Sequence, residues 1–218
     1  MSLTLVIGNK NYSSWSLRPW LLLKQFGVTF DEVKLPLDTP EFYERLKQYS
    51  PAGRVPVLVD GELSVWDSLA ICEYVNEQFL AGRGWPADPA ARAQARSLSA
   101  EMHSGFSALR NALPMNCRKR VATPALDDEV QRDIARVREI WREAREQHAQ
   151  RGGFLFGEFS IADAMFAPVA VRFGSYAIEI GGIERRYVET LLALPALQEW
   201  YAEAATEGIA VLHEQNIA

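Results

Sequence analysis

A cluster of hydroxyl groups, Tyr12-Ser13-Ser14 followed by Ser16, lies between a predicted strand and a predicted helix. A hydroxyl donor at the start of a helix adds a hydrogen bond to the positive end of the helix dipole, and so stabilises a bound anion. No histidine is near these serines in the sequence, so we predict that they donate hydrogen bonds and are not nucleophiles. The alternative is that the serines only form the turn, with Ser16 capping the helix.

A second set of polar residues, Asp67-Ser68, opens another predicted helix. Free N–H groups at a helix start bind carboxylates. The Ser68 hydroxyl would add one more donor, and the Asp67 carboxylate could meet an amino group. An ordinary N-cap also explains both residues, and the two roles are compatible.

The cysteines indicate neither a metal site nor a disulfide scaffold. Cys72 and Cys117 form no CxxC motif and no metal-ligand spacing. A thiol–disulfide oxidoreductase is disfavoured as well, because no cysteine lies between Ile7 and Ala70, where that chemistry places its nucleophile. We therefore predict no metal and a reducing, cytoplasmic location.

Composition describes a chain that can build a core. The 218 residues (24.5 kDa) are 48% hydrophobic and 23% charged, with 23 Lys+Arg against 28 Asp+Glu and a net charge of −5. Nucleic acid and acidic membrane surfaces are therefore not expected as partners. No apolar stretch approaches the roughly 18 residues of a membrane span, and the apolar run after Met1 is too short for a signal peptide.

The elements that must position these residues divide the chain in two. The first part is predicted to have the order β-α-β-α-β-β-α, with strands at 3–7 and 29–35, helices at 16–27, 40–48 and from 67, and a hairpin about Asp60-Gly61. The stretch 81–87 is predicted to be a linker. We expect domains at 1–81 and 88–218.

The second part shows no strand pattern. Helices are predicted at 88–111, at about 130–151, at 160–173, at 184–190 and at 191–205, with a loop at 113–126. Ser160 and Asp163 form a capping box, which we interpret as a folding signal and not as catalysis. The fold class is therefore a small α/β unit followed by an all-helical unit.

Four motifs, in this order, resemble the cytosolic glutathione S-transferase family. Tyr12–Arg18 (YSSWSLR) is similar to the serine-type SSCSxR signature of the zeta class, which includes maleylacetoacetate isomerases. Trp15 departs from it, since the signature has cysteine there. Stretch 102–111 also resembles a zeta helix segment. The other three motifs are GRVPVL (53–58), DSLAICEY (67–74) and GEFSIAD (157–163).

The resemblance implies a thioredoxin-like N-terminal domain that binds glutathione and an all-α domain that forms the electrophile pocket. Ser13 would donate to the glutathione sulfur, with Ser14 and then Tyr12 as alternatives. Val55, before a cis Pro56, would pair with the cysteinyl backbone of glutathione. The remaining implied contacts are Arg54 beside the glycine carboxylate, Ser68 on the γ-glutamyl carboxylate and Asp67 on its amino group.

Three functions stay open at this stage. The first is transfer of glutathione to small electrophiles, and the second is glutathione-dependent cis–trans isomerisation of the maleylacetoacetate type, for which Arg18 or Arg118 could hold a substrate carboxylate. The third is a binding or scaffold protein without catalysis. The resemblance also implies a homodimer. Candidate pocket residues are Met102, His103, Phe106, Met115, Asn116 and Arg118.

Overall fold

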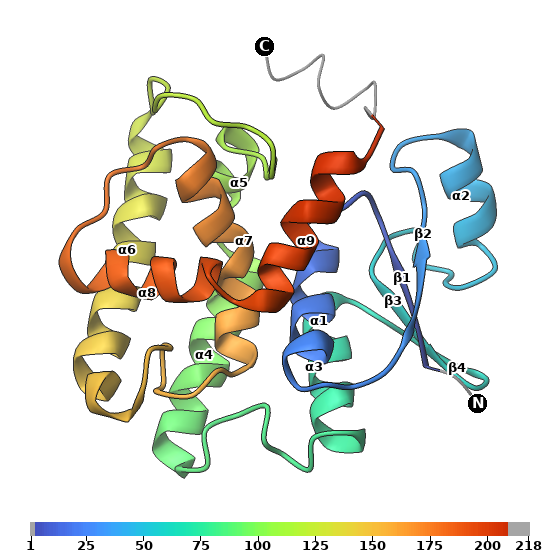
Figure 1. Cartoon of the computed structure of the whole chain (residues 1–218), viewed down its shortest axis with the longest axis horizontal. Coiled ribbons are helices and arrows are strands. Elements are labelled where there is room, and N and C mark those ends of the chain that lie inside the picture. Colours follow the sequence, from blue (N-terminus) through green and yellow to red (C-terminus); the bar gives the residue numbers. More distant parts are fainter. Residues whose placement is uncertain (1–2, 209–218) are drawn as a thin grey trace.

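A computed structural model of the chain describes residues 3–208 (Figure 1). Its first part has the predicted order β-α-β-α-β-β-α. The elements are β1 (Leu3–Ile7), α1 (Ser14–Gln25), β2 (Asp31–Lys34), α2 (Pro40–Leu46), β3 (Val57–Asp60), β4 (Leu63–Trp66) and α3 (Ser68–Gln78).

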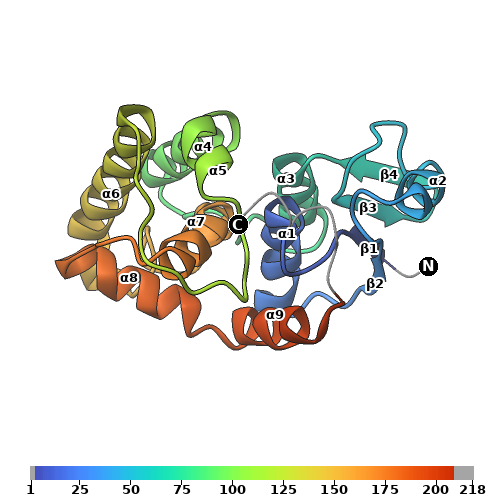
Figure 2. The ribbon, with the colours of Figure 1, turned by 90° about the horizontal axis from the view of Figure 1, so that it is seen from above.

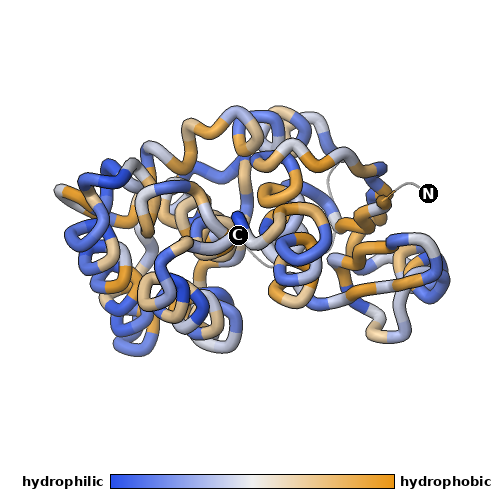
Figure 3. Tube along the Cα trace, turned by 90° about the horizontal axis from the view of Figure 1, so that it is seen from below, coloured by the Kyte–Doolittle hydropathy of each residue, from blue (hydrophilic) through white to orange (hydrophobic). Residues whose placement is uncertain are grey.

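The four strands form one mixed sheet in the order β2-β1-β3-β4, with β1 parallel to β2 and antiparallel to β3. Side chains alternate across a strand. Leu5 and Ile7 accordingly belong to the large core that includes α1 and α3, while Val6 packs with Phe42 and Leu46 of α2. Figure 2 shows α1 and α3 on one side of the sheet and α2 on the other, and Figure 3 shows hydrophobic stretches along the strands.

Several predicted boundaries in this part are wrong by one or two residues; for example, strand β2 begins at Asp31 and not at 29, and helix α2 ends at Leu46 and not at 48. Helix α1 begins at Ser14, so Ser13 is its N-cap and Ser16 lies inside it. Ser16 does not cap the helix, because its Oγ accepts the Gly8 N–H of the preceding turn at 3.2 Å. The hairpin pairs Asp60 with Leu63, so its loop is Gly61-Glu62 and not Asp60-Gly61.

The second part is built of helices, as predicted. They are α4 (Pro89–Ser104), α5 (Ser107–Ala112), α6 (Asp128–His148), the 3-10 helix η1 (Ala149–Arg151), α7 (Ile161–Ser175), α8 (Gly182–Leu192) and α9 (Pro195–Thr206). Helix α7 is buried at every position except Gly174 and packs against α1. Helix α9 lies beside α1 (Figures 1 and 2). None of the helices described is long and apolar enough to cross a bilayer.

The single helix predicted over 88–111 is instead two helices, α4 and α5. The break falls at Gly105, where a Cβ would lie 2.8 Å from the Glu101 carbonyl, and at Phe106, whose φ is +58°. Arg110 donates to the carbonyls of Met102, His103 and Gly105 at the end of α4. These contacts satisfy carbonyls that a helix end leaves unpaired.

Candidate active site

A pocket of about 580 Å³ opens between the start of α1, the loop before β3, the β4–α3 junction and α4. The five residues predicted to bind glutathione all line it, and four others join them. The lining residues are Trp15, Ala52, Arg54, Val55, Pro56, Trp66, Asp67, Ser68 and His103.

One wall of the pocket is backbone. The Val55–Pro56 peptide bond is cis, as the resemblance implied. Within residues 3–208, the N–H and C=O of Val55 have no hydrogen-bond partner. An extended peptide could therefore pair with this edge as an added strand does.

The start of α3 forms the polar end of the pocket. Asp67 caps the helix by accepting from the N–H groups of Leu69 at 2.9 Å and Ala70 at 3.2 Å, and its φ is +77°. A left-handed aspartate costs about 1–3 kcal/mol, and such residues cluster at functional sites. Ser68 is left with its N–H and hydroxyl at the helix terminus, where an anion is stabilised.

A buried guanidinium lies behind Ser68. Arg18 is 2% exposed, and its Nη1 donates to Ser68 Oγ at 3.2 Å. Burial, followed by repulsion from Arg110 and Arg172, lowers the pKa of Arg18 to about 9. Arg18 therefore stays charged at neutral pH and adds positive potential at this end of the pocket.

His103 joins the site from α4. Its Nε2 lies 2.9 Å from Asp67 Oδ2, and its ring contacts Trp15 edge-on at 5.3 Å. Burial lowers the pKa of His103, and Arg18 and Arg110 also lower it, against the opposite effect of Asp67. A neutral imidazole that donates from Nε2 keeps Nδ1 as an acceptor, and Nδ1 has no partner in the described part of the chain.

The serines lie at the start of α1, immediately before Trp15, and neither Ser13 nor Ser14 is among the lining residues. Ser13 is 6% and Ser14 8% exposed. Ser13 Oγ donates to Ser16 Oγ at 2.7 Å. Hydroxyl protons rotate, so this hydrogen bond can reverse: Ser16 then accepts from Gly8 N–H and donates to Ser13, which leaves the Ser13 proton for a sulfur.

Most of the other predicted pocket residues lie outside this pocket. Met102, Phe106, Met115 and Asn116 are buried and do not line this pocket. Arg118 Nη2 donates to Tyr12 Oη at 3.0 Å. Both cysteines are free and buried, and burial raises the pKa of Cys117 to about 12, so a reactive thiolate there is disfavoured.

Sequence reasoning underestimated His103 and missed Trp66 and Ala52. His103, one of the predicted pocket residues, comes from the helical part and lines the same pocket as the five residues predicted to bind glutathione. No local pattern marks a histidine that meets an aspartate 36 positions earlier. Trp66 is 47% exposed and ends an edge strand, where an apolar residue also suits the strand pattern.

Comparison with known proteins matches both parts of this architecture. Residues 12–78 match the model of the glutathione S-transferase N-terminal domain, and residues 127–203 match that of the C-terminal domain. A crystal structure of a glutathione transferase homolog from Burkholderia GL BGR1, with bound glutathione, covers 95% of this chain and 100% of its own with a TM-score of 0.71 and 25% identity.

Two curated relatives match shorter stretches. A probable maleylacetoacetate isomerase of Caenorhabditis elegans is 37% identical over 99 residues, 45% of each chain. A dichloromethane dehalogenase of Methylorubrum extorquens is 44% identical over 63 residues, 28% of this chain and 22% of its own. The chain thus matches less than half the length of either relative. Because both domain models match in the order that the sheet and helices show, the chain belongs to the glutathione S-transferase family.

Proposed function

We propose that the protein is a glutathione transferase that adds the glutathione thiol to small electrophiles. The observation that carries the proposal is one pocket that brings together an unpaired backbone edge at Val55, a helix N-terminus at Ser68 and a carboxylate at Asp67. Glutathione has a peptide backbone, a γ-glutamyl carboxylate and an α-amino group that complement these three features. Arg54 adds a cation for the glycine carboxylate.

The proposed chemistry starts with the thiol. A free thiol has a pKa near 8.5, so only a few per cent is thiolate at pH 7. The Ser13 hydroxyl, at the N-cap of α1, would donate to the sulfur and favour the anion. The thiol proton passes to water, and the thiolate adds to a polarised double bond of the electrophile: the C–S bond forms as the π bond breaks, and the resulting carbanion takes a proton from water. Trp15 and His103 form the wall that links the start of α1 to α4.

Glutathione-dependent isomerisation is the second candidate, favoured by the maleylacetoacetate isomerase relative. In that reaction, addition of the thiolate, bond rotation and elimination return the glutathione. Arg18 lies behind Ser68 and donates to its hydroxyl, so its positive charge would favour a substrate carboxylate at this end of the pocket, whereas Arg118 donates to Tyr12 and to the Glu207 carbonyl. Turnover of a panel of electrophiles that includes maleylacetone separates the two reactions.

Glutathione binding tests the site directly. Ser68→Ala removes a hydroxyl next to the predicted carboxylate position, so we expect calorimetry to show about tenfold weaker binding, the effect of one hydrogen bond to a charged group. Ser104→Ala is the matched control, since Ser104 is exposed on α4 and bonds only the Ala100 carbonyl among the described residues. Equal affinities in the two variants would remove Ser68 from the site, and no binding to the native protein would favour the scaffold alternative.

A homodimer is the proposed assembly. The family resemblance implies a dimer, and oligomers of one chain are mostly two-fold symmetric. Leu63 on the edge strand β4 and Phe79 at the end of α3 are large apolar side chains that are 48% and 38% exposed, and contact with a second copy would cover them. We expect light scattering to give twice the 24.5 kDa chain mass.

A charge on this surface should break the proposed dimer. Phe79→Glu should shift the mass toward that of one chain, because a carboxylate buried between subunits is unfavourable. Tyr43→Glu, an exposed aromatic on α2, is the control. A native protein of single-chain mass would refute the dimer.

The domain division and the location are also part of the proposal. We propose domains at 1–81 and 88–218. We also propose a cytoplasmic location, because the two cysteines are free.

A further inference from the structure

The turn that presents Ser13 is held by the opposite end of the chain. This turn runs from Gly8 to Tyr12, between β1 and α1. Its Lys10 and Asn11 N–H groups donate to Glu207 at 2.8 and 3.0 Å. The Lys10 carbonyl accepts from Trp200 Nε1 at 2.8 Å, and the Asn11 carbonyl accepts from Cys117 N–H at 3.1 Å. All four backbone polar groups of these two residues are thus bound by the helical part.

Glu207 is the centre of this contact. It follows α9 directly, its side chain is 3% exposed, and each carboxylate oxygen accepts one of two consecutive N–H groups. Lys34 Nζ lies 3.2 Å from the first of these oxygens. A buried carboxylate with two backbone donors and a cation has fixed geometry, because losing any partner leaves an uncompensated charge.

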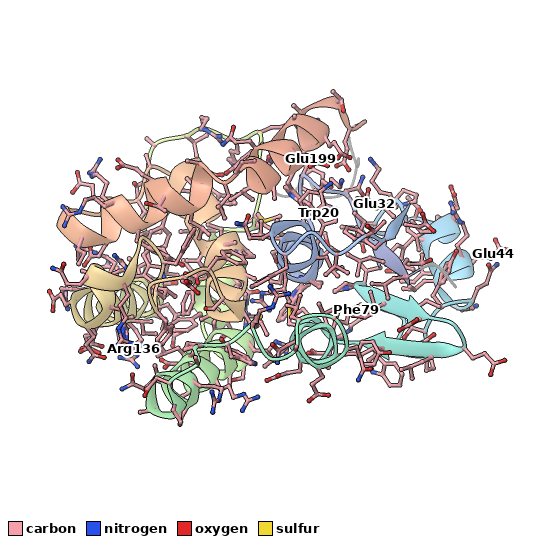
Figure 4. The ribbon with its side chains drawn as sticks, turned by 60° about the horizontal axis from the view of Figure 1, so that its bottom comes forward. Trp20, Glu32, Glu44, Phe79, Arg136 and Glu199 are labelled. Carbon is pink, nitrogen blue, oxygen red and sulfur yellow. The ribbon has the colours of Figure 1, made fainter. Side chains whose placement is uncertain are left out.

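Lys10 reinforces the same junction with its side chain. Lys10 is fully buried, and its Nζ lies 2.8 Å from Glu32 and 2.7 Å from Glu203. The ammonium also lies over the rings of Trp20 and Trp200, at 4.7 and 5.4 Å from their centroids. Figure 4 shows Trp20 and Glu32 close to Glu199 where α9 approaches α1 and β2.

The turn has few contacts of its own that would set its shape. Within it, the Asn9 carbonyl accepts from the N–H groups of Tyr12 at 3.2 Å and Ser13 at 2.8 Å. Lys10 and Asn11 make their backbone bonds only with distant residues of the described chain. A shift of these two residues would therefore move the Asn9–Ser13 bond and the N-cap position of Ser13.

We propose that Glu207 is a positioning residue for thiol activation: through Lys10 and Asn11 it holds the turn in the conformation that aims Ser13 at the glutathione sulfur. The proposal rests on the proposed function, because positioning matters only if Ser13 meets a thiol. A displacement of about 1 Å can cost up to about 100-fold in rate. The helical part would then contribute to activating glutathione as well as to binding the electrophile.

Glu207→Gln tests the proposal. The amide replaces one accepting oxygen with an NH₂ group that faces an N–H, so one of the two backbone donors loses its partner. We expect about tenfold lower kcat at neutral pH, a higher pKa of the bound glutathione thiol, and glutathione affinity within about twofold of the native value. Amide hydrogen exchange at Lys10 and Asn11 should become faster.

Glu199→Gln is the matched control. Glu199 is on α9, the helix that Glu207 follows, and joins it to α1 through Lys24 at 2.7 Å; among the described residues it has no hydrogen bond or ion pair with the turn. This variant loses the same charge and should keep the native kcat, thiol titration and exchange rates.

Two results would overturn the proposal, and a third concerns the function. Faster exchange with an unchanged thiol titration and kcat would make Glu207 merely structural. Unchanged exchange at Lys10 and Asn11 would show that Glu207 does not hold the turn. If the native protein binds no glutathione, the proposed function fails together with the role in activation. Amide hydrogen exchange at Lys10 and Asn11 would still show whether Glu207 holds the turn.

Discussion

Ser13→Ala is expected to lower the rate of glutathione transfer at pH 7 by about ten- to a hundredfold. One hydrogen bond to a charged group is worth roughly 1.5–3 kcal/mol, and each 1.36 kcal/mol is a factor of about ten. Losing a donor to the thiolate disfavours the anion, so the pKa of the bound thiol rises. Glutathione affinity should stay nearly native, because Val55 and Ser68 are unchanged.

The titration of bound thiolate by its ultraviolet absorbance identifies the hydroxyl. It should move in Ser13→Ala and stay in place in Ser14→Ala, the matched variant one residue along the chain. Movement in Ser14→Ala alone would assign the chemistry to Ser14. If neither titration moves, backbone N–H groups at the start of α1 activate the thiol, and the serines only form the turn.

Asp163→Ala is expected to destabilise the protein by about 2–5 kcal/mol. Asp163 is fully buried and accepts from Leu155 N–H at 3.0 Å, from Ser160 N–H at 2.9 Å and from the Ser160 hydroxyl at 3.0 Å. Alanine leaves two backbone donors buried without an acceptor, and each costs about 1–3 kcal/mol. Chemical denaturation at constant pH measures the change.

The control for this variant is an exposed aspartate at a helix N-cap. Asp127 caps α6 by accepting from Val130 N–H at 2.9 Å, and Asp127→Ala should cost only about 1 kcal/mol, since water replaces the lost partner. If Asp163→Ala costs no more than Asp127→Ala, the buried capping box is not a major source of stability.

The stability contributed by Asp163 should also depend on pH. Burial raises its pKa from 3.8 to about 6, against the opposite effect of its hydrogen bonds. Because the folded pKa is the higher one, proton binding favours the folded state below the unfolded value, and this contribution is lost as pH rises through 6. From pH 4 to 6, the native protein should lose about 2 kcal/mol relative to Asp163→Asn.

Local patterns in the sequence predicted most elements and most of the pocket. The β-branched run at 3–7, the Asp67 cap and the Ser160–Asp163 box involve neighbours within a few residues, and the structure has each of them. The predicted residues between Arg54 and Ser68 line one pocket for the same reason. A hairpin of β3 and β4 joins Val55-Pro56 to Asp67-Ser68 over a short stretch of chain.

Predicted helix boundaries were wrong where contacts with residues outside the helix compete with local sequence preference. Ser16 has a good capping side chain, yet α1 starts at Ser14 because the Ser16 hydroxyl accepts from Gly8 and the turn before it is bound by Glu207. The break in the helix predicted to 111 is local instead: Phe106 adopts a φ of +58°, and Gly105 before it occupies a place where a Cβ would meet the Glu101 carbonyl.

The sequence by itself determined the α/β-then-helical fold and the hydroxyl and cap motifs, since each is encoded within a few neighbouring residues, whereas the cis bond before Pro56 was implied only by the family resemblance. Only the tertiary structure decided that His103 meets Asp67 in the pocket, and that Glu207 meets Lys10 across 197 positions. Contacts at such separations depend on how whole helices pack, and the residues involved carry no periodic or turn signal of their own. Helix packing therefore brings the two parts of the chain together at the candidate active site.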